Sequence, residues 1–133
     1  MTFVSQSMFS KPTTYDIFVY GTLRSGGEYH SLYLRYFPCL LADYWLPNYA
    51  LYDYAGLYPF MVPETGRSVV GEVYRVPRAT KEALDDFEDV AERLYRWVYL
   101  PMHGFYTYLA DNIDIATMPR VPGGDWLTYC SAG

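Results

Sequence analysis

Short runs of aromatic and β-branched residues, each with proline or glycine near its ends, follow one another along most of this chain. Such runs are typical of β-strands, and the turn-forming residues between them keep each strand short. The runs are YDIFVY at 15–20, CLLADYWL at 39–46, NYALYDY at 48–54, LYPFMV at 57–62, SVVGEVYRV at 68–76, YRWVYLPM at 95–102 and FYTYLA at 105–110. They predict consecutive strands of one mainly antiparallel sheet or barrel.

One later segment has a clear helical period. Residues 81–92 carry Leu84, Phe87 and Ala91 at spacings of three and four, and Thr80 before them is of the type that caps a helix N-terminus. The pattern predicts a helix over 81–92 with these three residues toward the core. A second helix is less clearly marked, because EYHSLYLRYF at 28–37 fits either a short helix that stops before Pro38 or an aromatic loop.

The two ends of the chain lack such periods. Residues 1–14 are polar and aperiodic, which indicates a flexible lead-in, and the fold is expected to begin at Tyr15. The tail NIDIATMPRVPGGDWLTY at 112–129 reads as irregular, with Trp126 and Leu127 available to pack back onto the body. With 133 residues in all, residues 15–133 fit one domain that buries its own core without a metal or a disulfide.

Charge and hydropathy limit the partners. A formal net charge of -5, without any cluster of lysine and arginine, argues against nucleic acid. The chain shows neither a basic, apolar leader nor an unbroken apolar stretch of the roughly 18 residues that a membrane span needs. We therefore expect a cytoplasmic protein without a membrane partner. Its surface is compatible with a monomer or a homodimer.

The usual catalytic motifs are missing from the sequence. It has no GxSxG, P-loop or HExxH motif, and no grouping of histidine and carboxylate with metal-ligand spacing. Cys39 and Cys130 are far apart and form no CxxC pair, so they are interpreted as ordinary thiols. His30 and His103 are interpreted as surface or half-buried side chains. The sequence predicts neither a metal nor a cofactor, and carboxylates remain as the candidate catalytic groups.

The predicted helix singles out one of these carboxylates. At about 100° per residue, Glu88 lies only about 40° from Leu84, whereas Asp85, Asp86 and Asp89 lie about 100° or more from it and are expected to face water. Glu88 is thus the acid closest to the core, where partial desolvation would raise its pKa into the range of a general acid or base. The alternative is an edge glutamate whose carboxylate reaches solvent.

The strand end at Tyr20 is a second candidate site. A strand that stops at Gly21 and turns exposes consecutive backbone N–H groups, and such concavities bind carboxylates or phosphates without a basic side chain. The alternative is a turn that needs glycine for steric reasons alone.

Six short motifs in a fixed order resemble a known family. They are FVYGTLRSGG at 18–27, LYDYAGLYPFMVP at 51–63, VVGEVYRV at 69–76, LDDFEDV at 84–90, YRWVYL at 95–100 and GGDWL at 123–127. Together they resemble the γ-glutamyl cyclotransferase-like proteins, and within them the AIG2-like and γ-glutamylamine cyclotransferase branch. The resemblance runs from about Tyr15 to the end of the chain.

The resemblance implies an α+β fold, namely a small mixed α/β fold with a mainly antiparallel β-barrel and a few short helices. It also implies a cavity between the YGTL loop and the helix that carries the acid. Members of the family release 5-oxoproline from a γ-glutamyl compound when its α-amine attacks its own γ-carbonyl, which explains why no protein nucleophile is needed. On this resemblance Glu88 matches the catalytic general acid/base.

The resemblance also implies which residues bind the substrate. Tyr20, Gly21, Thr22 and Leu23 match the loop whose backbone holds the glutamyl carboxylate. Tyr58, with Pro59 beside it, and Tyr95 match positions that line the family's pocket, although core packing explains each of them equally well.

The chain departs from many relatives in the stretch after YGTL. Glu28, Tyr29 and His30 stand there in place of an asparagine, which puts an acid at the expected mouth of the pocket. This acid would favour neutral or cationic amine leaving groups over carboxylated ones. Two alternatives to an enzyme remain open, a non-catalytic small-molecule binding module of the same fold and an interaction domain that uses its exposed tyrosines.

Overall fold

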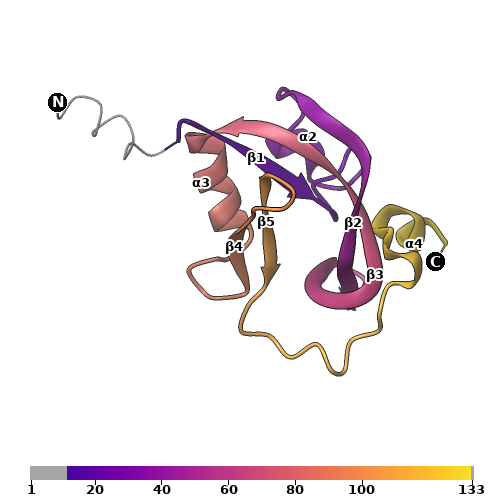
Figure 1. Cartoon of the computed structure of the whole chain (residues 1–133). Helices are drawn as coiled ribbons and strands as arrows, with labels where there is room; N and C mark the ends of the chain where they lie inside the picture. The colour runs from indigo at the N-terminus through magenta and orange to yellow at the C-terminus, as the bar shows by residue number, and fades with distance from the viewer. Residues whose placement is uncertain (1–11, 133) are drawn as a thin grey trace.

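The computed structural model describes residues 12–132. Five strands form one sheet in the order β2-β3-β1-β5-β4. The elements, labelled as in Figure 1, are β1 (Thr14–Val19), α2 (His30–Tyr33), β2 (Cys39–Tyr54), β3 (Tyr58–Pro77), α3 (Arg78–Phe87), β4 (Tyr95–Leu100), β5 (Phe105–Ala110), the 3-10 turn η1 (Pro122–Gly124) and α4 (Trp126–Ala132).

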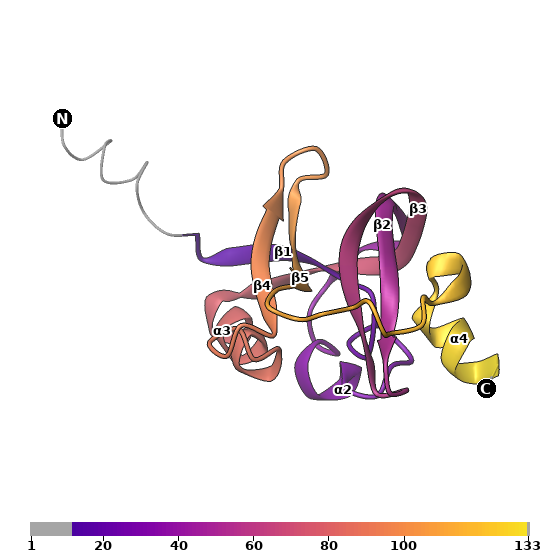
Figure 2. The same cartoon turned by 90° about the horizontal axis from the view of Figure 1, so that it is seen from below.

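The sheet is mixed but mainly antiparallel. β1 runs antiparallel to β3, from the pair Thr14 and Pro77 to the pair Val19 and Glu72, and parallel to β5. β4 and β5 form an antiparallel hairpin at the other edge. Figures 1 and 2 show that β3 curls across the molecule, so the sheet forms a half-barrel with short helices around it. The α+β class with a mainly antiparallel, barrel-like sheet is confirmed.

The central strand β1 has hydrophobic packing on both of its faces. Side chains alternate between the two faces of a strand, and Phe18 packs into a cluster with Phe105 and Trp126. Ile17 and Val19 point to the opposite face and pack in a second cluster that contains Leu84 of α3. β1 is therefore held in place from both sides, and its C-terminal end at Val19 is fixed relative to α3.

The structure corrects the number of strands between residues 39 and 76. Four predicted strands are two long ones, β2 and β3, joined by a turn in which Ala55 and Gly56 have positive φ angles. Both expected breaks fall at one register shift, where β2 passes from Pro47 to Tyr49 while its partner β3 passes from Ser68 to Pro63. Because β2 is an edge strand, the missing N–H of Pro47 interrupts no ladder on its outer side.

The main helix differs from its prediction at both ends. α3 begins at Arg78 after the extended Pro77, so Thr80 is not the N-cap, and it ends at Phe87. Asp89 takes a left-handed conformation with φ 51°, which ends the helical path. As a result Ala91 lies in a turn and is exposed, contrary to its predicted place in the core. Leu84 is buried and Phe87 is partly buried, as the period predicted.

The segment at 28–37 and the tail also differ in part from expectation. Within residues 28–37, only His30–Tyr33 forms a helix. The tail, expected to be irregular, ends in helix α4, whose first residue Trp126 is buried while Leu127 packs against the same cluster. Of the predicted lead-in, residues 1–11 lie outside the described residues, and Thr14 already belongs to β1.

Three further observations concern residues 12–132. None of their helices is long and apolar enough to cross a membrane. None of their groupings of His, Cys, Asp and Glu has three or more members placed to hold a metal ion. Cys39 and Cys130 carry free, exposed thiols.

Candidate active site

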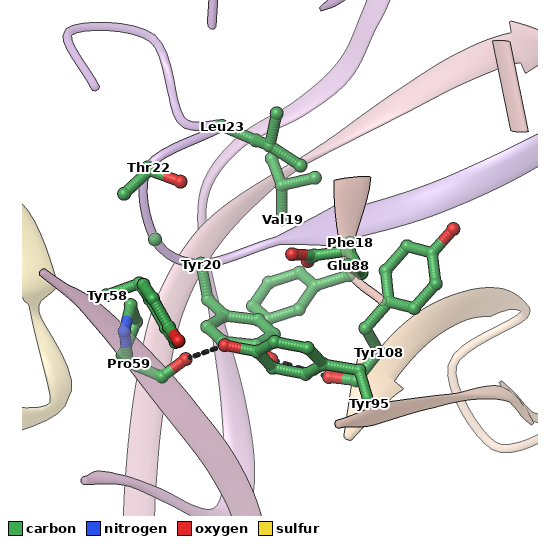
Figure 3. A pocket seen from close by; sticks show the side chains of 11 residues that line it. Phe18, Val19, Tyr20, Thr22, Leu23, Tyr58, Pro59, Glu88, Tyr95 and Tyr108 are labelled. Atoms are coloured by element: carbon green, nitrogen blue, oxygen red, sulfur yellow. Dashed lines mark hydrogen bonds between the residues drawn. The ribbon is translucent and has the colours of Figure 1, made fainter. Parts of the chain in front are cut away.

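A cavity opens where the end of β1, the start of β3 and the end of α3 meet β4 and β5 (Figure 3). Its lining includes every residue that the sequence predicted for the site, which are Tyr20, Gly21, Thr22, Leu23, Tyr58, Glu88 and Tyr95. The inner part is narrow, with a free volume of about 20 Å³. A second chamber of about 150 Å³, called the outer chamber below, adjoins it and shares part of its lining. The inner part therefore has room for about one water-sized group, such as one oxygen of a carboxylate.

The loop after β1 forms one wall of this cavity. It is folded by backbone hydrogen bonds from Arg24 N to Gly21 O at 3.1 Å and from Tyr29 N to Thr22 O at 2.9 Å. Among residues 12–132, no group accepts a hydrogen bond from the N–H of Gly21, Thr22 or Leu23. Three consecutive N–H groups without protein acceptors are a ready site for an anion.

Glycine at position 21 is required by a close approach. A Cβ atom there would lie 2.8 Å from Cγ and 2.9 Å from Cδ of Pro59. The contact brings the YGTL loop against the Tyr58–Pro59 end of β3, so two segments predicted for the site from separate motifs touch directly. Steric need and ligand binding, the two alternatives for this glycine, do not exclude each other.

A buried ion network holds the loop from behind. Arg24 Nε donates to Glu72 Oε2 at 2.6 Å, and Arg24 Nη1 donates to Asp125 Oδ1 at 3.0 Å. The backbone N–H of Ser25 donates to Glu72 Oε1 at 2.8 Å. Because Arg24 and Glu72 are both buried, the loop is tied to β3 and to the start of α4. Sequence reasoning missed this network, although Arg24 and Glu72 stand within two of the motifs it quoted.

Glu88 stands at the opposite wall, directly after α3. Its N–H donates to Leu84 O at 2.8 Å, which keeps the residue on the last helical turn although α3 ends at Phe87. Figure 3 shows its carboxyl group directed into the pocket, with the Tyr20–Leu23 loop on one side and the rings of Tyr95 and Tyr108 on the other. Burial of the carboxyl, and then the negative charge of Asp89, raises the pKa of Glu88 from 4.5 to about 8.

The tyrosines of the cavity are fixed by hydrogen bonds. The hydroxyl of Tyr20 donates to Tyr108 O at 2.6 Å, and that of Tyr95 donates to Pro59 O at 2.6 Å. Burial raises the pKa of Tyr20 and that of Tyr95 well above the ordinary value. These phenols therefore stay neutral, and Glu88 is the residue of the inner lining whose pKa lies near neutrality.

Tyr108 and Asp85 were also missed by the sequence reasoning. Tyr108 of β5 lines the cavity, and its hydroxyl donates to Asp85 Oδ1 at 2.7 Å while Lys81 Nζ donates to Asp85 Oδ2 at 2.6 Å. Asp85, which was expected to face water, is thus partly buried and bonded, whereas Asp86 and Asp89 are exposed as predicted. No sequence signal distinguishes Tyr108 from its aromatic neighbours in FYTYLA.

The family comparison agrees with this geometry. The sequence pattern of the family described as "Gamma-glutamyl cyclotransferase, AIG2-like" matches residues 17–128. The chain belongs to this family. The matched range contains every predicted site residue, from Tyr20 to Tyr95.

Individual members of the AIG2-like family are similar to this chain over most of their own length. A Vibrio cholerae protein, named provisionally as a γ-glutamylcyclotransferase, is 42% identical over 94 residues, which are 63% of this chain and 79% of that protein. The γ-glutamylcyclotransferase family protein YtfP of Escherichia coli K12 is 34% identical over 112 residues, or 84% and 95% of the two chains. A Pyrococcus horikoshii crystal structure has a TM-score of 0.67 and 29% identity, with 84% and 89% covered.

The three residues after YGTL that were expected at the mouth of the pocket are not all at the cavity. Tyr29 lines the outer chamber. Glu28 is exposed and is absent from the lining of both the inner cavity and the outer chamber. The ring of His30 turns toward the backbone, with Nδ1 2.9 Å from Leu23 O. Asp89 also lines the outer chamber beside Glu88, and it is exposed to solvent as predicted.

Proposed function

We propose that this protein is a γ-glutamylamine cyclotransferase-type enzyme that releases 5-oxoproline from a γ-glutamyl compound, with Glu88 as general acid and base. The observation that carries the proposal is the position of the Glu88 carboxyl, which faces the loop of free N–H groups across one cavity and has a pKa raised to about 8. Membership of the AIG2-like family and the names of the relatives support the same reaction class.

The loop N–H groups of Gly21, Thr22 and Leu23 suit the α-carboxylate of the glutamyl group. They supply donors without a cation, and the narrow inner cavity that they border has room for one oxygen of a carboxylate. With the carboxylate held there, the γ-carbonyl and its amine extend past Glu88 toward the outer chamber. Tyr20, Tyr58 and Tyr95 then line the path of the glutamyl chain.

The reaction needs only proton transfers from the protein. The Glu88 carboxylate accepts a proton from the substrate's α-ammonium group, and the neutral nitrogen attacks the γ-carbonyl to close a five-membered ring. The protonated carboxyl gives this proton to the departing nitrogen as the original amide bond breaks. The regenerated carboxylate takes the second proton from the ring nitrogen, which leaves the lactam with one N–H, and passes that proton to the freed amine. A pKa near neutrality serves both steps, and this acid–base role is worth on the order of 10² to 10⁴ in rate. Because the amine and the carbonyl belong to one molecule, the protein adds only the orientation that brings the two groups into contact.

Release of 5-oxoproline from a panel of γ-glutamyl amines and γ-glutamyl amino acids tests the proposal. We expect turnover of at least one compound and a fall of at least about a hundredfold in Glu88→Gln, which keeps the shape and removes the titratable group. Glu92→Gln is the matched control, because Glu92 is exposed four residues later, and it should keep wild-type activity.

Two results would speak against the enzyme. Thermal stabilisation by panel compounds without turnover would favour the binding module of the same fold. Equal turnover in wild type and Glu88→Gln would leave the reaction standing but remove Glu88 from it.

A further inference from the structure

The tyrosines of the cavity differ in what their hydroxyl groups are free to do. Those that line the inner cavity are Tyr20, Tyr58, Tyr95 and Tyr108. Resting on the function proposed above, we propose that Tyr58 is a catalytic residue whose hydroxyl donates a hydrogen bond to the γ-carbonyl oxygen and stabilises the negative charge that forms there during ring closure. This role is distinct from that of Glu88, which moves protons.

Three of these hydroxyls already donate to the protein. Tyr20 and Tyr95 each donate to a backbone carbonyl oxygen at 2.6 Å. Tyr108 donates to Oδ1 of Asp85 at 2.7 Å. A phenol carries a single proton, so each of the three would have to give up a hydrogen bond to the protein before it could donate to a substrate.

The hydroxyl of Tyr58 has no such partner. Among residues 12–132, no group forms a hydrogen bond with it, and its oxygen is not sealed from the surrounding space. The ring itself is held, because it stacks on Tyr54 with centroids 5.2 Å apart and meets Phe60 edge to face at 5.7 Å. Burial above all raises the pKa of Tyr58, so the hydroxyl keeps its proton near neutral pH. A fixed, protonated and unpaired hydroxyl is a donor prepared in advance for a developing charge.

Tyr58 also stands where the γ-carbonyl has to lie. It lines both the inner cavity and the outer chamber, as Glu88 does. With the carboxylate held at the inner cavity and the leaving group in the outer chamber, the carbonyl between them crosses the junction of the two. In Figure 3, Glu88 lies between Tyr58 on one side and Tyr108 on the other. Two different groups of one lining are thus available for the nitrogen atoms and for the carbonyl oxygen.

The reaction creates a need for this donor. When the α-amine attacks, the π electrons of the γ-carbonyl move onto its oxygen, and they return when the bond to the departing nitrogen breaks. The loop N–H groups are then occupied by the α-carboxylate, and Glu88 is occupied by the protons of the two nitrogens. The Tyr58 hydroxyl keeps its own proton throughout. Its hydrogen bond strengthens as the charge grows, so it lowers the barrier more than it strengthens substrate binding.

Tyr58→Phe tests this role because it removes the hydroxyl and keeps the stacked ring. For the best substrate of the panel, kcat should fall by about a hundredfold or more, the usual effect of losing one donor to an oxyanion. KM should change little. The dissociation constant of glutaric acid monoamide, which keeps the carboxylate and the amide but has no amine to attack, should also change little. Thermal unfolding should match wild type, since the ring contacts remain.

Two further variants serve as comparisons. Tyr54→Phe removes the hydroxyl of the stacked neighbour, which lines neither chamber, and should keep the wild-type kcat. Thr22→Val removes the other hydroxyl that lines both chambers and forms no hydrogen bond within residues 12–132. It should lower kcat less than Tyr58→Phe does. The reverse order would assign the donor to Thr22 and overturn the role of Tyr58.

The pH profile distinguishes a donor from a residue that acts through Glu88. Because Tyr58 stays neutral, Tyr58→Phe should lower kcat by the same factor across the neutral range and leave the inflection set by Glu88 in place. A shifted inflection would mean that Tyr58 acts on the pKa of Glu88 instead, and it would overturn the proposed role.

The remaining outcomes separate the two proposals. Equal kcat in wild type and Tyr58→Phe, or a loss that appears as a higher KM with weaker binding of the monoamide, overturns the role of Tyr58 and leaves the cyclisation standing. If the wild type releases 5-oxoproline from no compound of the panel, both proposals are overturned.

Discussion

Gly21 and Pro59 are in contact so close that no side chain fits between them, because a Cβ on Gly21 would come within 2.8 Å of the Pro59 ring. The contact joins the loop of free N–H groups to the start of β3. The carbonyl of Pro59 also accepts a hydrogen bond from the hydroxyl of Tyr95. Three segments of the cavity wall are thereby set relative to one another. Displacing either partner should move the N–H groups more than it disturbs the core.

Gly21→Ala should therefore reduce activity before it reduces stability. The new methyl group must push the loop or Pro59 aside, which misaligns the N–H groups and should lower kcat/KM by about a hundredfold, the usual effect of displacing reactive groups by about 1 Å. The measurement is 5-oxoproline release together with thermal unfolding. Gly56→Ala serves as a control for fold, since a Cβ at Gly56 meets nothing within 4 Å, although its positive φ of 76° will cost some stability. Full activity in Gly21→Ala would show that the contact does not position the loop.

The pH dependence of catalysis should follow Glu88. As a base it works in its ionised form, so kcat/KM should rise with pH through an inflection near 8. The charge of Asp89 contributes to the raised pKa of Glu88, and Asp89→Asn should shift the inflection to lower pH. A pH–rate profile of wild type, Asp89→Asn and Asp86→Asn checks this. An unchanged inflection in Asp89→Asn would contradict the assignment of the titrating group.

Glu88 should also make the folded state less stable as pH rises. Between pH 4.5 and about 8, the folded protein retains a proton on Glu88 that the unfolded chain has lost. The free energy of unfolding therefore falls across this window, by up to about 1.4 kcal/mol per pH unit, and levels off above it. Glu88→Gln lacks this dependence, so its stability relative to wild type should increase from pH 5 to 8. Denaturant unfolding of both proteins at several pH values measures the difference between their free energies of unfolding. A difference that does not change with pH would contradict the prediction.

Removing one partner of the buried ion network should cost much more than removing an exposed one. Arg24→Met leaves the buried Glu72 carboxylate without its cation, and we expect a loss of about 3 to 5 kcal/mol in the free energy of unfolding. Arg75→Met is the control, because Arg75 binds Asp16 at 2.8 Å on the surface. Its loss should lower the free energy of unfolding by less than about 1 kcal/mol. The double variant Arg24→Met with Glu72→Met should recover part of the loss. Equal losses of stability in Arg24→Met and Arg75→Met would mean that Arg24 is solvated.

The sequence predicted the nature of the fold better than the ends of its elements. Hydrophobic and aromatic runs identified where strands lie, but Pro47 and Asn48 were interpreted as a break between two strands. In an edge strand the chain passes such residues through a register shift, with Asn48 at φ 67°, and continues. Helix α4 was missed although Asp125, a common N-cap residue, stands directly before it and accepts from Thr128 N.

For the site, local patterns identified the two walls and not what supports them. Glu88 was found because it lies near Leu84 on a helical projection. That geometry holds in the structure although α3 ends at Phe87, the residue before Glu88. Arg24, Glu72 and Asp125 come together only through the pairing of distant strands and the docking of α4, which no local spacing reveals. Asp89 is exposed as predicted, but its left-handed conformation, which no local spacing reveals, accompanies its place in the lining of the outer chamber.

The central place of β1 also bears on how the protein reaches its folded state. β1 leads the described chain, yet its neighbours come from far along the sequence, and Tyr20 donates its hydrogen bond to a carbonyl 88 residues away. Contacts this distant require large loops to close before they stabilise anything, which places folding in the range of milliseconds to seconds. During synthesis at roughly 5 to 20 residues per second, β1 leaves the ribosome several seconds before β5 exists to pair with it.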